Sequence, residues 1–282
     1  MDQVIREEIR SFVRASPDNR FAGSNRPYFD EPLVGYAAAE DPLFSEFKKI
    51  IGDFHLTPGE VLHNASGCRE EEAKTVICWV LPISEATRRS NRQEKKMPSR
   101  EWAMTRSHGE RFNNLLRIYV TNLIHSIGAI VASPLLTGLW RPVKDPRIGM
   151  ASTWSERHAA YAAGLGTFSL NDGFITDRGI AHRCGSVVTD LEITASPRTC
   201  ADPWSNCLYH RNGSCGLCVH RCPAGAISLE GHDKEKCQAY VYGELRQTAG
   251  PLYGVMETGC GLCQTGVPCE ARVPTTHTNQ GI

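Results

Sequence analysis

The sequence lacks long apolar runs, and it lacks an excess of charge of either sign. No stretch approaches the roughly 18 consecutive apolar residues that span a bilayer, and the opening MDQVIREEIR has no apolar segment typical of a secretory signal. Lysine plus arginine and aspartate plus glutamate both number 31, so the summed charge gives no long-range attraction to nucleic acid or to an anionic membrane. We therefore expect a cytoplasmic protein, with neither a membrane nor a nucleic acid as partner.

Internal repeats and low-complexity tracts are also missing, and the middle of the chain alternates short apolar runs with helical periods. Residues 75–81 (TVICWVL) are β-branched and aromatic and stop at Pro82, which predicts a buried strand. Residues 129–132 and 184–189 predict two more strands. With 282 residues and 41% hydrophobic side chains, the chain can bury a large core without disulfides.

Two capping-box spacings predict helices between these strands. Ser107 and Glu110 precede apolar residues at helical period. Thr153 and Glu156 open a second helix that ends at Gly164, where a residue free to take positive φ is favourable. Strands that alternate with helices predict an α/β layered core.

Two segments outside this pattern carry weaker signals. The first 60 residues mix short helical pieces, at 4–13 and 44–51, with proline turns, and we expect them to wrap around the core. Residues 88–100 carry six basic side chains and one acidic side chain. They form either a solvated helix face or loop, or a sleeve for an anionic substrate.

Twelve cysteines are the strongest signal in the sequence. A reducing cytosol disfavours disulfides, and clustered cysteines there more often bind metal. Nine of the twelve fall between Cys200 and Cys269, whereas Cys68, Cys78 and Cys184 are scattered and suit small buried apolar positions. The C-terminal stretch is therefore expected to be a separate unit organised by metal.

The segment CGLCVHRCPAGAI has the cysteine spacing of a ferredoxin-type [4Fe–4S] module. Cys215 and Cys218 can bind neighbouring irons of one cube, and Cys222, which precedes Pro223, sends its sulfur to a second cube. Zinc is the alternative because CxxC pairs also bind zinc tetrahedrally, but the continuation after Cys222 is typical of ferredoxin modules. Three nearby histidines are expected at the surface or in hydrogen bonds: His210, His220 and His232.

The remaining ligands come from less regular positions. Position 212, where the pattern has another cysteine, is asparagine, so we expect Cys207 to supply that corner, with Cys200 as the alternative. In the second motif, CGLCQTGVPC, Cys269 takes the place expected at Val267. The swapped pairing of two-cluster ferredoxins then gives Cys207, Cys215, Cys218 and Cys269 for one cube and Cys237, Cys260, Cys263 and Cys222 for the other.

One long segment resembles a known family. It reads SERHAAYAAGLGTFSLNDGFITDRGIAHRCGSVVTDLEI, and together with the cysteine motifs it resembles epoxyqueuosine reductase and the catalytic part of reductive dehalogenases, over roughly residues 75–270. The resemblance implies a nitroreductase-like α/β core at 61–198, after the wrapping segment at 1–60. It also implies that this core holds cobalamin with its lower base detached, beside a ferredoxin-like domain at 199–282 with two [4Fe–4S] clusters.

The resemblance further implies contacts to the corrin ring. Glycines would let backbone groups approach the amide-edged ring closely. The expected contacts are Tyr161, Gly164, Leu165, Gly166, Gly173 and Arg183. The segment around His55 nearly matches a motif that places histidine under cobalt, but its glycine, Gly59, stands one position late, so we expect His55 to be structural.

Two positions depart from the family at its proton donors. Met150, six residues before Glu156, stands where epoxyqueuosine reductases have an aspartate. Pro82 and Ile83 follow the strand after which dehalogenases carry a tyrosine. The sequence therefore assigns no catalytic residue.

Taken together, these patterns predict a reductase that passes single electrons through two clusters to base-off cobalamin, which reduces an unidentified small-molecule substrate. An external donor of ferredoxin or flavodoxin type would supply the electrons. Two alternatives stay open. One is an electron carrier for a partner's corrinoid or metal centre, and the other is epoxyqueuosine reduction on tRNA, which Met150 and the balanced charge disfavour.

Overall fold

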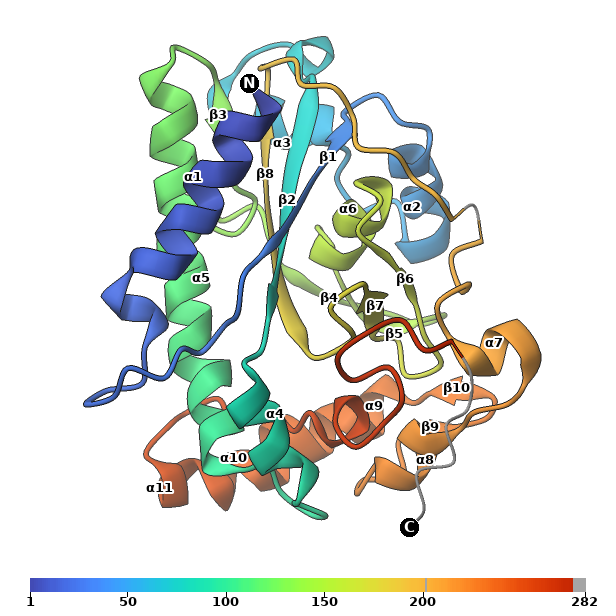
Figure 1. Ribbon diagram of the computed structural model, residues 1–282. Coiled ribbons are helices and arrows are strands. Elements are labelled where there is room, and N and C mark those ends of the chain that lie inside the picture. Colours follow the sequence, from blue (N-terminus) through green and yellow to red (C-terminus); the bar gives the residue numbers. More distant parts are fainter. Residues whose placement is uncertain (201, 276–282) are drawn as a thin grey trace.

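The computed structural model describes residues 1–200 and 202–275 and has a four-stranded antiparallel sheet at its centre (Figure 1). The strand order is β1-β2-β8-β3, with bounds Leu33–Ala38 for β1, Thr75–Pro82 for β2, His182–Thr189 for β8 and Val131–Ala132 for β3. The three strands predicted from the sequence are confirmed as β2, β3 and β8. Every residue of β2 is buried because helices cover both faces of the sheet, which explains its unbroken apolar sequence.

Helices form a layer on each side of the sheet (Figure 1). One layer is α1 (Asp2–Ala15) and α5 (Arg100–Ser126), and the other is α2 (Leu43–Ile51), α3 (Pro58–Ser66) and α6 (Glu156–Ala162). Successive side chains of β2 point to opposite faces, so Ile77 and Trp79 belong to the first core and Val76 and Cys78 to the second. The predicted layered α/β architecture is confirmed.

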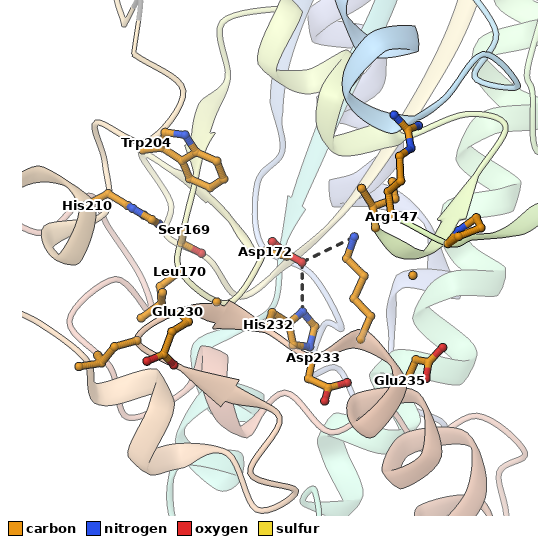
Figure 2. Close-up of a pocket in the computed structure, with 16 residues that line it drawn as sticks. Arg147, Ser169, Leu170, Asp172, Trp204, His210, Glu230, His232, Asp233 and Glu235 are labelled. Atoms are coloured by element: carbon orange, nitrogen blue, oxygen red, sulfur yellow. Dashed lines mark hydrogen bonds and ion pairs between the residues drawn. The ribbon is translucent and has the colours of Figure 1, made fainter.

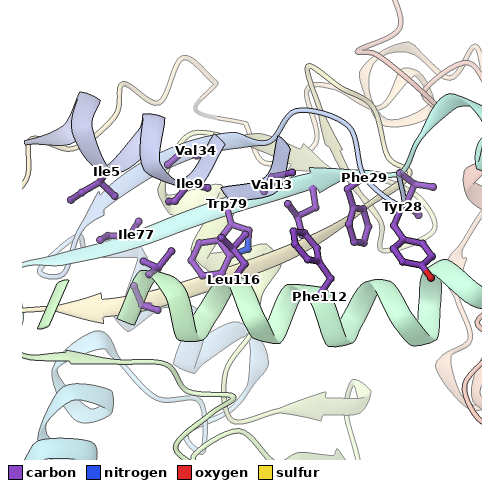
Figure 3. Close-up of a cluster of buried hydrophobic side chains, with 14 of the residues drawn as sticks. Ile5, Ile9, Val13, Tyr28, Phe29, Val34, Ile77, Trp79, Phe112 and Leu116 are labelled. Atoms are coloured by element: carbon purple, nitrogen blue, oxygen red, sulfur yellow. The ribbon is translucent and has the colours of Figure 1, made fainter. Parts of the chain in front are cut away.

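Trp79 fills the first core between the sheet, α1 and α5 (Figure 3). Its indole Nε1 donates a hydrogen bond to Asn113 Oδ1 at 2.9 Å, which satisfies the buried polar group. The ring lies against Gly185, its partner on β8, and a Cβ at that position would overlap the indole. Packing therefore requires glycine at 185.

Both helix starts differ from the predicted capping boxes. The N-cap of α5 is Ser99, whereas Ser107 lies inside the helix and donates a hydrogen bond to Glu257 O at 2.8 Å. The N-cap of α6 is Ser155, and the hydroxyl of Thr153 binds backbone groups of another loop. Capping-box spacing also occurs between residues one turn apart inside a helix, so spacing alone does not locate a helix start.

The first 60 residues contribute to the sheet as well as to its covering. The helices predicted at 4–13 and 44–51 are confirmed as α1 and α2, but β1 lies between them and pairs with β2 along its length. The sequence missed this strand because LVGYAA is short and contains glycine. A Cβ at Gly35 would stand 2.7 Å from Ala163 O, so the glycine lets the end of α6 pack on the strand.

The C-terminal part lies at one end of the sheet (Figure 1). Two hairpins lie near it, β4 (Pro142–Asp145) with β5 (Gly149–Ser152) and β6 (Gly166–Phe168) with β7 (Phe174–Thr176). The other elements are η1 (Pro17–Asn19), η2 (Glu70–Glu72), α4 (Glu85–Arg92), α7 (Leu208–Asn212), α8 (Leu217–Arg221), β9 (Ile227–Ser228), β10 (Gly231–His232), α9 (Lys234–Gln238), η3 (Ala239–Glu244), α10 (Leu245–Gln247), α11 (Ala249–Tyr253) and η4 (Leu262–Gln264). The ferredoxin-like character of this part stays a prediction. None of the described helices is long and apolar enough to cross a membrane.

Candidate functional site

Four cysteines from distant parts of the C-terminal region line one small cavity. We call them the first cysteine set: Cys207, Cys215, Cys218 and Cys269. Burial, followed by the three other thiols of the set, raises the pKa of Cys269 well above its usual value. Cys200 does not line this cavity and instead lies close enough to Tyr161 to influence its pKa. The structure thus brings together the residues that the sequence assigned to one cube.

The other four cysteines gather next to this cavity. We call them the second cysteine set: Cys222, Cys237, Cys260 and Cys263. Burial, followed by Cys260 and Cys237, raises the pKa of Cys263 well above its usual value. Burial also raises the pKa of Cys260 to about 12, and Cys237 and Cys222 add to this. Cys218 of the first set influences Cys263 as well, so the two sets are neighbours.

Both sets have the chemistry of cluster ligands. A buried thiol with a raised pKa is a poor free thiolate, and bound iron reverses this by stabilising the negative charge. The backbone N–H of Ala226 donates to Cys222 Sγ at 3.3 Å, a contact of the kind that tunes iron–sulfur potentials. Across residues 1–200 and 202–275, no three His, Cys, Asp or Glu side chains are grouped as a metal-ion site. A cube does not require convergence on one ion because each thiolate binds a different iron.

Glu270 anchors the last cysteine of the first set to α4. Its buried carboxylate accepts hydrogen bonds from Arg92 Nη2 at 2.6 Å and Arg92 Nε at 3.1 Å, and Arg88 Nε lies 3.7 Å away. Gly266 N also donates to this carboxylate at 2.7 Å. Because Glu270 directly follows Cys269, the ion pairs fix the end of the cysteine-bearing loop. Two arginines of the predicted basic segment therefore have partners inside the protein, which favours the helix-face interpretation over a sleeve for an anionic substrate.

A cleft of 590 Å³ lies between the β4–β5 hairpin and the C-terminal part, and Asp172 stands in it (Figure 2). Asp172 Oδ2 lies 3.2 Å from His232 Nδ1 and 3.9 Å from Lys234 Nζ. The backbone carbonyl of Asp172 accepts a hydrogen bond from Arg157. Among the residues that the structure describes, Asp172 is the only non-glycine with positive φ, at 56°, a conformation that aspartate tolerates.

The Asp172–His232 pair is charged at neutral pH. Burial raises the pKa of Asp172, but the hydrogen bond with His232 and the charges of Lys234 and Arg157 outweigh burial and lower it. Burial lowers the pKa of His232, but hydrogen bonds to Asp172 and Cys237 prevail and raise it to about 9. This pair could not be found from the sequence, because Asn-Asp-Gly is typical of an ordinary turn.

Ser169 and Leu170 line both the cleft and the cavity of the first cysteine set. The two spaces therefore lie on opposite sides of one short segment of chain. A molecule bound in the cleft would contact two residues that also line the cavity of the first set. This shared wall links the cavity of the first cysteine set to the largest of these ligand-sized spaces.

None of the six expected corrin contacts lines the cleft: Tyr161, Gly164, Leu165, Gly166, Gly173 and Arg183. The three glycines approach protein atoms, because a Cβ at each would overlap a neighbouring segment. Tyr161 and Leu165 pack in the second core. As placed here, these residues do not fit a ring bound in the cleft, and their role as corrin contacts stays a prediction.

Arg183 belongs instead to a buried ion network. Its Nε donates to Glu110 Oε2 at 2.7 Å, and Arg117 Nη1 donates to Glu110 Oε1 at 3.0 Å. Burial raises the pKa of Glu110, but the two arginines outweigh burial and lower it to about 2. Arg117 Nη2 also donates to Oε1 of Glu156, the first residue of α6, at 3.4 Å. Arg183 and Cys260 both line a further cavity of 140 Å³, separate from the cleft and from the cavity of the first set.

His55 occupies a structural position, as the sequence suggested. Its Nε2 accepts a hydrogen bond from Ser155 N at 3.1 Å, and its ring stacks on Trp154 with centroids 5.9 Å apart. Burial, followed by the charge of Lys48, lowers the pKa of His55 to about 4. His55 is therefore a neutral hydrogen-bond acceptor in the core.

Comparison with known proteins identifies the fold. No protein-family model and no curated protein matches the sequence. Among solved structures, epoxyqueuosine reductase from Streptococcus thermophilus has a TM-score of 0.54 at 15% identity, with 98% of this chain and 68% of that chain covered. Selenomethionine-labelled epoxyqueuosine reductase has a TM-score of 0.52 at 16% identity, with 95% of this chain and 65% of that chain covered.

A reductive dehalogenase is similar to the same extent. The catabolic reductive dehalogenase in complex with 3-bromo-4-hydroxybenzoic acid has a TM-score of 0.53 at 14% identity, with 97% of this chain and 37% of that chain covered. The chain therefore spans 65% of the length of the labelled reductase and little more than a third of the dehalogenase. The resemblance stated from the sequence is confirmed, and at these identities it establishes that the chain has the fold shared by epoxyqueuosine reductases and reductive dehalogenases.

Proposed function

We propose that the chain is an iron–sulfur reductase that passes single electrons from two [4Fe–4S] clusters to an acceptor in the 590 Å³ cleft. The first cysteine set would hold the cube beside the cleft, and the second set would hold the outer cube. The observation that carries this proposal is the wall of Ser169 and Leu170, which the cleft shares with the cavity of the first set. Cys218 lies near enough to Cys263 to raise its pKa, and this proximity supports electron transfer from one cube to the other.

The cleft favours an enzyme over a simple electron carrier. A carrier needs only an exposed cluster edge, whereas an enzyme needs a concave space with a few fixed polar groups. Asp172, His232 and Lys234 provide such groups on the cleft wall. They would orient a polar ligand by charge and hydrogen bonding.

Cobalamin is the acceptor that the structural neighbours suggest. One dehalogenase structure of this fold is described with a mechanism for B12-dependent dehalogenation. When bound, cobalamin would supply low-valent cobalt as the immediate reductant. The charged residues of the cleft wall would face the polar edge of the ring. His55 would not serve as a cobalt ligand, because its Nε2 already accepts a hydrogen bond inside the core.

The substrate is proposed to be a small molecule. Met150 lies on β5 beside the cleft-lining Gly149 and has no proton to donate, whereas the Bacillus subtilis epoxyqueuosine reductase is described with a catalytic aspartate loop. One structure of that enzyme class contains an epoxyqueuosine-modified tRNA stem loop, so tRNA is the alternative substrate. The expectation against nucleic acid stays a prediction.

Anaerobic iron analysis tests the proposal first. Two cubes require about eight irons per chain, with the electron paramagnetic resonance signals of reduced [4Fe–4S] clusters. Stoichiometric zinc without iron-dependent absorbance would contradict it. Titration of the iron-loaded protein with cob(II)alamin then tests the acceptor, because bound base-off cobalamin has its own absorption spectrum. If none binds at micromolar concentration, the carrier alternative becomes the better account.

A further inference from the structure

A second depression, of 470 Å³, opens to solvent over the second cysteine set. Pro223, directly after Cys222, and Lys236, directly before Cys237, both line it. Both Cys222 and Cys237 are partly exposed. A cluster on the second set would therefore lie immediately beneath this depression, on a short route for an electron from outside the molecule.

Lysines dominate the rim of the depression. Lys96 and Lys236 line it together with a single acid, Glu244, and Lys95 is exposed next to Lys96. In the described part of the chain, neither Lys95 nor Lys96 has a carboxylate within 4 Å, whereas Lys236 lies 3.5 Å from Asp233. Lys95 and Lys96 of the basic segment thus place free positive charge beside the second cysteine set.

Hydrogen bonds from the cysteine-bearing region hold these lysines in place. Arg221 Nη1 of α8 donates to Glu94 O at 2.9 Å, and the hydroxyl of Tyr240 donates to Lys96 O. Tyr240 belongs to η3, a π-helical segment, and such segments are rare and frequent at functional sites. A loop whose backbone is already held in place loses less entropy when its side chains engage a partner.

We infer that this surface, the lysine face (Lys95, Lys96 and Lys236 around a floor of Ala239 and Tyr240), docks a small acidic protein that carries one electron at a time. The inference rests on the proposed function, because it requires a cluster on the second set. Redox encounters bury little surface and depend on charge to bring the partners together. A cationic rim around a small apolar floor suits such an encounter with an acidic carrier.

Charge reversal on the iron-loaded chain tests this inference. The variants are Lys96→Glu and Lys236→Glu, and the control is Lys49→Glu, an equally exposed lysine on α2, away from the lysine face (Figure 1). A purified acidic flavodoxin is the probe. Its Kd for the oxidised protein is measured by calorimetry at low and high ionic strength, and the rate at which its reduced form bleaches the clusters is measured by stopped flow. Dithionite, a small reductant, is used in parallel.

At low ionic strength we expect each rim variant to weaken flavodoxin binding and slow bleaching by about tenfold, and we expect salt to remove most of the difference. Lys49→Glu should bind and bleach like the wild type, and excess dithionite should reduce the clusters of all four proteins to the same final extent. Wild-type binding and rates in both rim variants would overturn the docking surface while leaving the clusters intact. If dithionite reduces no cluster even in the wild type, the proposed function fails, and the docking surface fails with it.

Discussion

Arg92 and Glu270 form a two-point contact, in which Nη2 and Nε of the guanidinium donate to the two carboxylate oxygens at 2.6 and 3.1 Å. Arg92 belongs to α4, which leaves the central sheet soon after β2, and Glu270 follows Cys269. The ion pair thus joins the layered core to the end of the cysteine-bearing region. Its carboxylate is 5% exposed, so it needs a partner.

Replacing Arg92 with alanine should weaken this junction. Loss of a charged, two-point hydrogen bond to a buried carboxylate costs about 2 kcal/mol of unfolding free energy. Arg89→Ala is the matched control, because Arg89 is 69% exposed on the same helix and pairs only with the exposed Glu85. Denaturant titrations of both variants measure the difference. Equal stability of the two variants would mean that the contact contributes nothing.

The cysteine sets predict which substitutions share an effect. Cys269→Ser and Cys207→Ser should each lower the iron content from about eight to about four per chain and remove the same resonance signal, because both residues line one cavity. Cys200→Ser should keep the full iron content, since Cys200 lies near Tyr161. Iron analysis with electron paramagnetic resonance checks this. Damage to different clusters by Cys269→Ser and Cys207→Ser would show that the pairing is wrong.

Gly261 lies between Cys260 and Cys263, and its substitution should disturb the second set. It has φ of 65°, and a Cβ there would overlap the ring of Trp102, so Gly261→Ala must displace the loop. We expect the iron content to fall by about half, with loss of the second cluster. Gly213→Ala is the control, because Gly213 has φ of 71° but no atom within 4 Å of the added Cβ. It pays only the backbone strain, about 1 kcal/mol, and keeps its iron. Equal iron contents would exclude the clash with Trp102 as a determinant of the loop.

His55 should make stability depend on pH. Its pKa is about 4 in the folded protein and 6.5 without burial, so the unfolded chain binds more protons between these values. The stability that neutral His55 contributes is complete above pH 6.5 and is lost as pH falls toward 4. Between pH 6.5 and 5 the loss is about 2 kcal/mol.

His55→Phe keeps the stacking on Trp154 and removes the titrating group, so its unfolding free energy should fall less steeply over this range. His63→Phe, at an exposed position on α3, should retain the wild-type slope. Denaturant titrations at pH 7, 6 and 5 measure both. The same slope in wild type and His55→Phe would contradict the assignment.

The features that could be predicted from the sequence are those that a single short stretch of residues determines by itself. The strand at 75–82 is apolar throughout because both faces are covered, and the cysteines follow a spacing set by cluster geometry. β1 was missed because Gly35 weakens its strand signal, although a helix end needs that glycine. The Asp172–His232 pair was missed because the two residues are far apart in sequence and meet only after the C-terminal part folds against the core. Glu110 was predicted to belong to a helix cap. It instead pairs with Arg117 on its own helix and with Arg183 on the distant strand β8, a contact that the sequence does not reveal.

Ser169 and Leu170 form the part of the cleft wall that lies next to the first cysteine set, so the proposed electron transfer depends on their position. Other parts of the cleft wall can vary without this constraint. If the proposed function holds, a change to this shared wall would alter the distance from the cleft to the first cysteine set and therefore the rate of electron transfer. The facing wall includes Arg147 and Ile148 at the turn between β4 and β5, which holds no cysteine. Under the proposed function, changes in that turn would reshape the cleft without touching the residues that would hold the clusters.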